Sequence, residues 1–333
     1  GAMTSFKVTS LPQAIGLKRS TLTITSDKKT YSVSLAVKGT KRYWKKENNT
    51  STKTTWGKRA IVRSVAYNNK IWIIGGCDQN FCNNNKIWNS VDGKNWTEIS
   101  NQLTETVFKK RTIFQSVVYD NKIWILGGFD GSIRYNDVWY SCDGISWTKI
   151  TDSAAWTVRG GFQSIVFNNK IWVLGGIDSS GKYLQDVWYS ENGIKWTLAT
   201  DNAAWSGRRT FQSVVYNNKL WVLGGVDSCG KYLQDVWYSK DGIKWALASN
   251  SIGLSVSTYL RSVAYEGKLW VIDGLNGNLW NSVDGKNWKN IYKPSCWYPR
   301  FHFQNLVYDN KIWVLGGYAC GNGYNYDNDV WSW

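Results

Sequence analysis

The sequence contains few of the residues on which most enzymes build catalysis. Among 333 residues it has one histidine, His302, and only five glutamates. A Ser-His-Asp triad would have to use that histidine, and nothing places a serine beside it. The sequence also has no G-x-S-x-G turn, no zinc-ligand spacing and no phosphate-binding loop. We therefore expect neither a cofactor nor a metal.

Cysteines and long apolar runs are also scarce. Six cysteines are too few for a disulfide framework in a chain of this length. Cys77 with Cys82, and Cys296 with Cys320, are candidate pairs if the compartment is oxidising. No apolar run approaches twenty residues, so no membrane-spanning helix is expected. Gly1-Ala2-Met3 resembles a cloning remnant, so a native signal peptide would have been removed from view. A secreted or cell-surface bacterial protein is favoured over a cytoplasmic one.

Acidic residues are outnumbered, with 24 Asp and Glu against 40 Lys and Arg, for a net charge of +16. Part of this charge recurs in one short turn, at Lys70, Lys122, Lys170, Lys219, Lys268 and Lys311. A basic surface can attract nucleic acid or an acidic partner, whereas lysines in turns can simply maintain solubility. Because no nucleic-acid-binding motif is present, nucleic acid is not the expected partner. Binding of a polyanion stays open as an alternative.

The sequence is rich in an internal repeat. An apolar run closed by two glycines recurs at 75–76, 127–128, 175–176, 224–225 and 316–317, and Asp273-Gly274 stands in the same register. The steps of 43 to 52 residues define six units. A repeat of this length is typical of solenoids and propellers.

Each unit is predicted to contain four short antiparallel strands. In the fourth unit, 211–216 and 219–225 flank the turn Asn217-Asn218, and 235–239 and 243–248 flank a second turn at Asp241-Gly242. Such a sheet cannot bury its faces alone, but six copies packed in a ring can. The tryptophans on the second and fourth strands, including Trp72 and Trp96, are expected to pack one blade against the next.

These features resemble the Kelch family of β-propellers. The residues that carry the resemblance are the Gly-Gly after an apolar strand, the aromatic residue of DVWY and the tryptophan after the Asp-Gly turn, over about residues 59–333. The resemblance implies an all-β, six-bladed Kelch-type propeller of four-stranded antiparallel blades. The sixth unit lacks its fourth strand, so we expect an N-terminal strand near Gly39 and Trp44 to complete it. The propeller would span 38–333, and residues 1–37 would be a separate segment with its own hairpin at 20–37.

The repeated arginines have two interpretations. Kelch interaction domains can use arginines around the channel mouth to bind carboxylates. The alternative is that each arginine pairs with an aspartate and fixes its blade. The loops after the paired glycines and the loops between blades should share one face of the ring, the loop face. The candidates on this face are Arg59, Arg111, Arg159, Arg208 and Arg300, with Asp78, Asp130, Asp178 and Asp227.

Breaks in the repeat are better candidates for a binding site. Arg63 and Arg261 replace the glutamine found at the same place in the other units, and His302 follows Arg300. A long loop at 318–329 beside a short one at 275–278 should leave a groove over blades five, six and one. Aromatic residues suited to stacking or anchoring a ligand are Trp297, Tyr298, Tyr318 and Tyr324, with Trp56, Trp156 and Trp205 at the mouth.

We therefore predict a monomeric, non-catalytic propeller that binds an acidic protein or glycan through its loop face. The single histidine excludes the two-histidine copper centre of the galactose-oxidase branch. Some bacterial Kelch propellers of similar architecture convert anomers of sialic acid, which requires an acid–base carboxylate and an arginine. This mutarotase alternative would use Glu105.

Overall fold

The protein is a six-bladed β-propeller with a separate N-terminal hairpin. The computed structural model describes residues 16–26, 29–39, 44–47, 56–78, 85–99, 111–253, 259–274, 277–292, 299–321 and 323–333. Two compact units are distinguished, residues 1–44 with Trp333 and residues 45–332. Within the described residues there is no helix, and so none long and apolar enough to cross a membrane.

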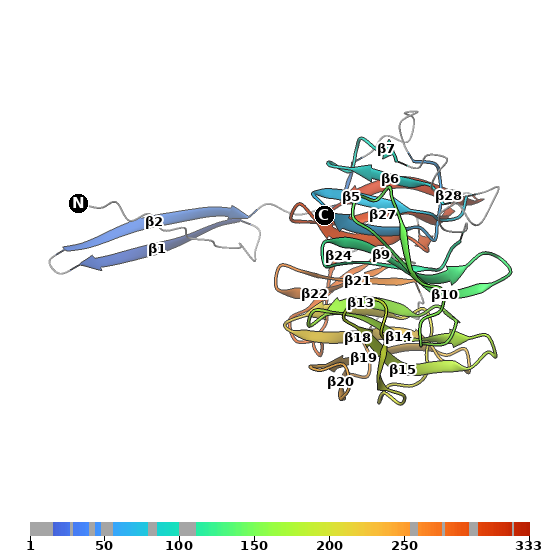
Figure 1. Ribbon diagram of the computed structural model, residues 1–333. Coiled ribbons are helices and arrows are strands. Elements are labelled where there is room, and N and C mark those ends of the chain that lie inside the picture. The colour runs from blue at the N-terminus through green and yellow to red at the C-terminus, as the bar shows by residue number, and fades with distance from the viewer. Residues whose placement is uncertain are drawn as a thin grey trace. The chain divides into compact units, whose positions relative to one another are not determined.

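The first unit contains one antiparallel hairpin (Figure 1). Strands β1 (Gly16–Ser26) and β2 (Lys29–Gly39) pair along their full lengths, from Gly16 opposite Gly39 to Ser26 opposite Lys29. The hairpin is longer than the range expected from the sequence, and the boundary that we placed at 37/38 falls inside β2.

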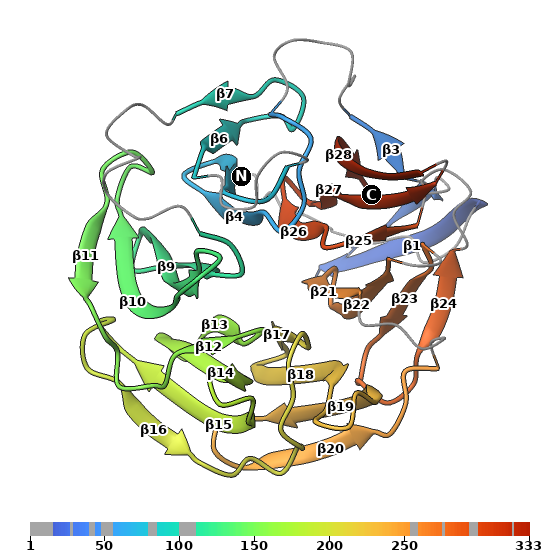
Figure 2. The ribbon, with the colours of Figure 1, turned by 90° about the vertical axis from the view of Figure 1, so that its right-hand side faces the viewer.

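The second unit is a ring of six blades around a central axis (Figure 2). Blade 1 comprises β4 (Arg63–Tyr67), β5 (Lys70–Ile74), β6 (Ile87–Ser90) and β7 (Thr97–Glu98). Blade 2 comprises β8 (Gln115–Tyr119), β9 (Lys122–Phe129), β10 (Arg134–Ser141) and β11 (Thr148–Thr151). Blade 3 comprises β12 (Arg159–Gly160), β13 (Gln163–Phe167), β14 (Lys170–Asp178), β15 (Tyr183–Ser190) and β16 (Thr197–Thr200).

The remaining blades repeat this plan. Blade 4 comprises β17 (Gln212–Tyr216), β18 (Lys219–Val226), β19 (Tyr232–Ser239) and β20 (Trp245–Ser249). Blade 5 comprises β21 (Leu260–Tyr265), β22 (Lys268–Asp273), β23 (Leu279–Ser282) and β24 (Lys289–Tyr292). Blade 6 comprises β25 (Arg300–Phe301), β26 (Gln304–Tyr308), β27 (Lys311–Gly321), β28 (Gly323–Ser332) and β3 (Lys45–Lys46). The six-bladed ring predicted from the repeat is confirmed.

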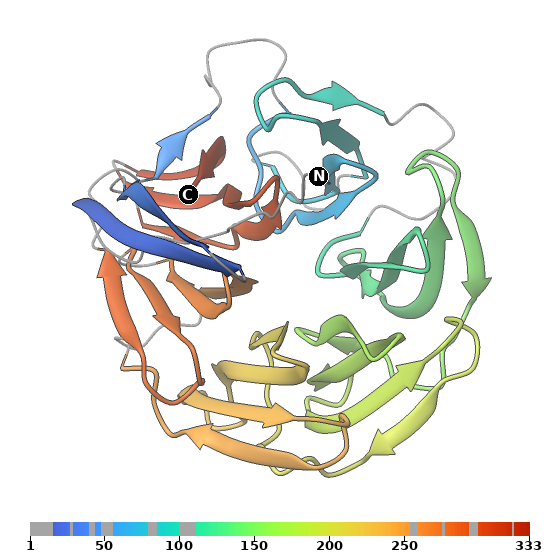
Figure 3. The same cartoon turned by 90° about the vertical axis from the view of Figure 1, so that its left-hand side faces the viewer.

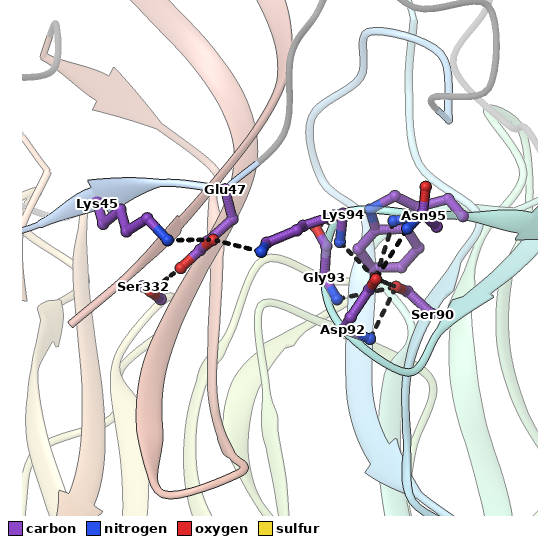
Figure 4. A network of polar contacts seen from close by, with 9 residues as sticks. Lys45, Glu47, Ser90, Asp92, Gly93, Lys94, Asn95 and Ser332 are labelled. Carbon is purple, nitrogen blue, oxygen red and sulfur yellow. Dashed lines mark hydrogen bonds and ion pairs between the residues drawn. The ribbon is translucent and has the colours of Figure 1, made fainter.

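An N-terminal strand completes the sixth blade, as we predicted because the sixth unit lacks a fourth strand. Strand β3 pairs with β28, and the Glu47 amide donates to the Val330 carbonyl at 2.8 Å. The Glu47 carboxylate also accepts from the Ser332 hydroxyl at 2.7 Å and lies 3.7 Å from the Lys94 ammonium of blade 1 (Figure 4). The closing strand therefore connects the last blade to the first.

Two kinds of turn lie on the same face of the ring. The turn between the first two strands uses left-handed residues such as Asn217 (φ 48°) and Asn218 (φ 52°), as tight hairpins require. The Tyr67 hydroxyl of blade 1 lies within hydrogen-bond distance of the carbonyls of Asn121 and Cys142, one in each kind of turn of blade 2. We call this side of the ring the turn face and the opposite side the loop face. Figure 3 shows the ring from the side opposite to Figure 2.

The turn between the third and fourth strands of a blade packs against a tryptophan of the preceding blade. In blade 1 the Ser90 hydroxyl accepts from the Gly93 amide at 2.8 Å, and Asp92 accepts from the amides of Lys94 and Asn95 (Figure 4). Burial opposes ionisation of Asp92, but these backbone hydrogen bonds outweigh it and lower its pKa to about 2.

The glycine of this turn must lack a side chain. A Cβ at Gly144 in blade 2 would lie 2.2 Å from the Trp72 ring of blade 1. The same contact joins Gly193 to Trp124, Gly242 to Trp172, Gly285 to Trp221 and Gly93 to Trp313. The prediction that second-strand tryptophans pack one blade against the next is confirmed.

Candidate functional site

The innermost strands of the six blades surround a cavity of about 410 Å³ on the ring axis. Each blade contributes at least two lining residues, and the two equivalent positions form two layers of six residues around the axis, which we call the rim ring and the channel ring. The rim ring, just before each innermost strand, consists of Ile61, Ile113, Gly161, Thr210, Tyr259 and His302. The channel ring consists of the residues two positions after each rim residue: Arg63, Gln115, Gln163, Gln212, Arg261 and Gln304.

The rim ring has an unusual backbone. Ile61 (φ 56°), Ile113 (φ 58°), Thr210 (φ 54°) and His302 (φ 54°) adopt a left-handed conformation, although none is glycine. Such residues are strained, more so when β-branched, and they concentrate at functional sites. Backbone hydrogen bonds between blades hold them, from the Ile61 amide to the His302 carbonyl at 3.1 Å and from Thr210 to Gly161 at 2.8 Å. The rim is therefore a fixed frame around the cavity.

Three residues of the channel ring, in blades 1, 2 and 5, hydrogen-bond to the next blade, whereas Gln212 donates to the Phe211 carbonyl of its own blade. Gln115 Nε2 donates to the Phe162 carbonyl at 2.6 Å, and Arg261 Nε donates to the Phe303 carbonyl at 2.7 Å. Arg63 Nε donates in the same way to the Phe114 carbonyl. In these contacts an arginine and a glutamine perform the same structural task, but the arginine adds a guanidinium charge to the cavity wall.

The charges of the two channel arginines, Arg63 and Arg261, repel each other, and no carboxylate among the described lining residues offsets them. Among the residues that the structure describes around the cavity, none is Asp or Glu. Burial, then repulsion from Arg261, lowers the pKa of Arg63 to about 9, and burial lowers the pKa of Arg261 to about 10. Both remain charged at neutral pH, so the cavity presents two poorly compensated positive charges.

His302 shares this part of the cavity. Its ring lies 5.6 Å from that of Tyr259 in an edge-on arrangement. Burial, together with the charges of Arg261 and Arg63, lowers the pKa of His302 to about 4. The imidazole is therefore neutral at pH 7 and can either donate or accept a hydrogen bond.

The repeated arginines are built into the blades and do not line the cavity. Arg159 Nη1 and Nη2 donate to the two carboxylate oxygens of Asp186 at 2.6 and 2.8 Å, and Nη1 also donates to the Gly175 carbonyl. The same bidentate pairs join Arg111 to Asp137, Arg208 to Asp235 and Arg300 to Asp329. These four arginines are at most 2 % exposed, which matches the blade-fixing alternative. Their partners are the aspartates of the third strands, not the Asp130, Asp178 or Asp227 that follow the glycines.

Blade 1 departs from this pairing. Its Arg59 is also buried, but Lys86 occupies the position that Asp137 holds in blade 2. Arg59 donates instead to the carbonyls of Gly57 at 3.1 Å and Gly75 at 3.3 Å, and burial lowers its pKa. Blades 1 and 5, which lack the third-strand aspartate, are the two blades that place an arginine in the channel.

Three tryptophans do not lie where the sequence suggested. We expected Trp56, Trp156 and Trp205 at the mouth, but all three are 0 % exposed. They pack edge-on against the fourth-strand tryptophans, for example Trp205 against Trp245 at 5.8 Å. This expectation was wrong because the crossing segments turn these rings into the space between blades.

The long segment of blade 6 is a hairpin, not the loop that we expected. Tyr318 on β27 is opposite Tyr326 on β28, with their rings 5.0 Å apart, and Tyr318 does not line the cavity. Trp297, Tyr298 and Glu105 lie outside the described residues, as do Cys82, Cys296 and the side chains of Cys320 and Tyr324. The groove over blades five, six and one rested on several of these residues and stays a prediction.

Sequence reasoning missed part of the cavity wall. Arg209, Tyr232 and Tyr259 also line it. Arg209 was hidden by the repeated Arg208 beside it, although Tyr259 could have been found by aligning it with Ile61. Within the described part of the chain, no group of His, Cys, Asp and Glu is arranged to hold a metal ion.

Comparisons with known proteins agree with this architecture. A family model described as the KLHDC2/KLHL20/DRC7 Kelch-repeats domain matches residues 25–189, and one described as the DUF6242 beta propeller domain matches residues 190–302. A solved structure, "Structure of YjhT", is similar with a TM-score of 0.65 and 16 % identity, over 83 % of this chain and 95 % of that one. At this identity the likeness concerns the fold alone. No curated protein matches the sequence significantly.

Proposed function

The chain is a Kelch-repeat β-propeller, and we propose that it binds a carboxylate-bearing ligand, the acidic part of a glycan or protein, in the axial cavity. Binding, not catalysis, is its proposed role. The observation that carries the proposal is the pair of channel arginines, Arg63 and Arg261, which have no carboxylate partner among the described lining residues.

A carboxylate would supply what this cavity lacks. Each channel arginine uses Nε to bond the next blade, and a guanidinium presents further N–H groups in a fixed plane suited to bidentate binding. Both arginines are charged at pH 7 despite burial that lowers the pKa of each. An anion would therefore recover electrostatic free energy that the free protein lacks.

The other lining residues suit an organic anion rather than a bare ion. Tyr232 and Tyr259 supply aromatic surface at the rim, and the four channel glutamines supply amide donors and acceptors. Arg209 adds a third positive charge and lies 5.7 Å over the Tyr183 ring. A ligand could place its carboxylate between the channel arginines and its remaining body against the tyrosines.

The mutarotase alternative requires a group that moves protons. Glu105, which we proposed from the sequence, lies outside the described residues, whereas neutral His302 lies in the same cavity as the arginines. An anomer-converting activity lost in both Glu105→Gln and His302→Gln would favour catalysis over simple binding.

The test is calorimetric titration of acidic sugars, their neutral counterparts and an aspartate- and glutamate-rich peptide at two salt concentrations. We expect saturable binding of at least one acidic compound and none of its neutral counterpart. Arg63→Gln with Arg261→Gln should weaken that binding by about 100-fold or more, because two charged hydrogen-bonding partners are lost. The control, Arg134→Gln with Lys182→Gln, removes the same charge from exposed positions. Equal binding by both variants would contradict the proposal.

A further inference from the structure

The turn face carries a second pattern, which is independent of the channel. The turn between the third and fourth strands exposes one Val or Ile in each of blades 1 to 5. These tip residues are Val91, Ile145, Ile194, Ile243 and Val283, and between 41 and 61 % of each is exposed. They are half of the ten exposed large apolar side chains in the described part of the chain. Single exposed apolar residues are ordinary, but one in every such turn is not.

The position of the tip residue varies while its character does not. In blades 1 and 5 it directly follows the serine, as Val91 follows Ser90. In blades 2, 3 and 4 it directly follows the glycine, as Ile145 follows Gly144. The turn itself is formed by the serine, the Asp or Asn and the glycine, through hydrogen bonds that involve no tip side chain. Formation of the turn therefore does not explain why each tip is apolar.

The tips are held in fixed positions on one side of the ring. The Tyr308 hydroxyl of blade 6 lies 2.9 Å from the Val91 carbonyl and 2.6 Å from the Asn69 carbonyl. The Tyr216 hydroxyl of blade 4 lies 3.0 Å from the Val283 carbonyl and 2.7 Å from the Gly267 carbonyl. Tyr67 of blade 1 and Tyr119 of blade 2 make the same pair of contacts, so four of the five tip-bearing turns are braced by the preceding blade. Blade 3 has Phe167 at this position and makes no such contact to the turn of Ile243. The four braced tips therefore lose little conformational freedom when they bind a surface.

Lysines accompany the apolar tips. In four of the five turns a lysine lies within three residues of the tip residue: Lys94, Lys195, Lys244 and Lys286. The turns between the first two strands of each blade, the inner turns, add further lysines. One of them is Lys219, whose ammonium lies 4.4 Å over the Tyr238 ring. The same face also carries acids. Asp120 and Glu191 are each paired with a lysine, at 2.6 and 3.1 Å, and Lys94 lies 3.7 Å from Glu47. The carboxylates within the tip-bearing turns accept hydrogen bonds from backbone amides of their own turn, at Asp92, Asp143, Asp241 and Asp284. With Glu266 and Asp309 included, the lysines of these two kinds of turn still outnumber the acids. Lysines of this kind can keep their stems on apolar surface and their charge in water.

We propose that the turn face docks on the surface of an anionic lipid bilayer. The tip residues would enter the boundary between headgroups and acyl chains, and the lysines would contact lipid phosphates. A bilayer fits better than an acidic globular protein because the tips belong to separate turns of five blades, and a plane can touch them all at once. The cavity rim, at the opposite ends of the innermost strands, would then face away from the membrane and stay accessible.

The test is flotation with vesicles of phosphatidylcholine alone and with about 30 mol % phosphatidylglycerol. The tip variant carries Val91→Ser, Ile194→Ser, Ile243→Ser and Val283→Ser. The control carries Ile133→Ser, Leu198→Ser, Leu247→Ser and Ile291→Ser, four exposed apolar residues outside these turns. Both variants keep every lysine and the basic N-terminal segment, so adsorption by charge alone affects them equally.

We expect the unaltered protein to float with the anionic vesicles, and the tip variant to need about tenfold more lipid, or more, while the control does not. No flotation of the unaltered protein, or equal flotation of the two variants, would overturn the proposal. Tip-dependent binding to an acidic protein, without flotation, would assign the face to a protein partner and would also overturn it. None of these outcomes depends on ligand binding in the channel.

Discussion

Replacing both channel arginines by glutamine should make the ligand-free protein more stable. Glutamine occupies the channel ring in the other four blades, and Gln115 makes the bond to the next blade that Arg63 makes in blade 1. The double variant Arg63→Gln with Arg261→Gln therefore keeps the connection between blades and removes two desolvated charges.

The size of the gain follows from the lowered pKa values. For Arg63 the pKa falls from the ordinary arginine value to about 9, which at about 1.36 kcal/mol per pKa unit sets an upper bound of about 5 kcal/mol. Because side chains and water in the cavity can relax around the charge, we expect about 1–3 kcal/mol for the pair. With an unfolding entropy of about 2.1 cal/mol/K per residue, this raises Tm by about 1–4 °C.

The pH dependence has a defined sign. A guanidinium whose folded pKa is lowered destabilises the fold while it is charged, so the gain in the variant is fully present below about pH 9. It shrinks as the pH rises above that value, because the arginine of the unaltered protein then loses its proton on folding.

Thermal and urea unfolding at pH 7 without ligand would measure this effect, with Arg134→Gln and Lys182→Gln as the control for net charge. An earlier transition in the channel variant would refute the reasoning. It would mean that the arginines stabilise the blades and are not held ready for a ligand.

Three further results are expected. Asp186→Asn should cost about 3–5 kcal/mol in urea unfolding because it leaves Arg159 buried without its carboxylate; a loss below 1 kcal/mol would show that the pair is dispensable. Gly144→Ala should cost about 2–4 kcal/mol, since its Cβ would overlap the Trp72 ring, whereas Gly181→Ala, with no atom within 4 Å, should cost only about 1 kcal/mol from its positive φ. Carboxylate binding should raise the pKa of His302 from about 4 by offsetting the arginine charges that help to lower it. Calorimetry in buffers of different ionisation enthalpy should then show proton uptake and tighter binding between pH 6.5 and 4, and both effects should be absent in His302→Gln.

The fold could be read from the sequence because every blade restates the same local signals. The tight turn between the first two strands, the paired glycines of five units and the tryptophan after the Asp-Gly or Asn-Gly turn of blades 1 to 5 each fix a short-range geometry. Six units built on these signals leave one closed arrangement. The same comparison of units showed that the last one lacks a fourth strand, and β3 occupies that place.

The cavity could be predicted only in part. Arg63, Arg261 and His302 were found because each breaks the repeat at its position. The buried pairs were not assigned, since Arg159 and Asp186 are 27 residues apart and only the folded sheet brings them together. The mouth tryptophans were misplaced for a related reason, because a rotation of the crossing segment decides whether Trp205 faces solvent or the next blade.

The closing strand has a consequence for biosynthesis. Glu47 leaves the ribosome early, but its partner Ser332 follows 285 residues later. Until then five blades can form while the segment that closes the sixth waits, and the unfilled edge of the ring stays exposed to other chains. Joining ends so far apart costs about 5 kcal/mol of loop entropy, from the logarithm of the separation. A folding helper or a ribosome pause would have its greatest effect at the step in which β28 pairs with β3.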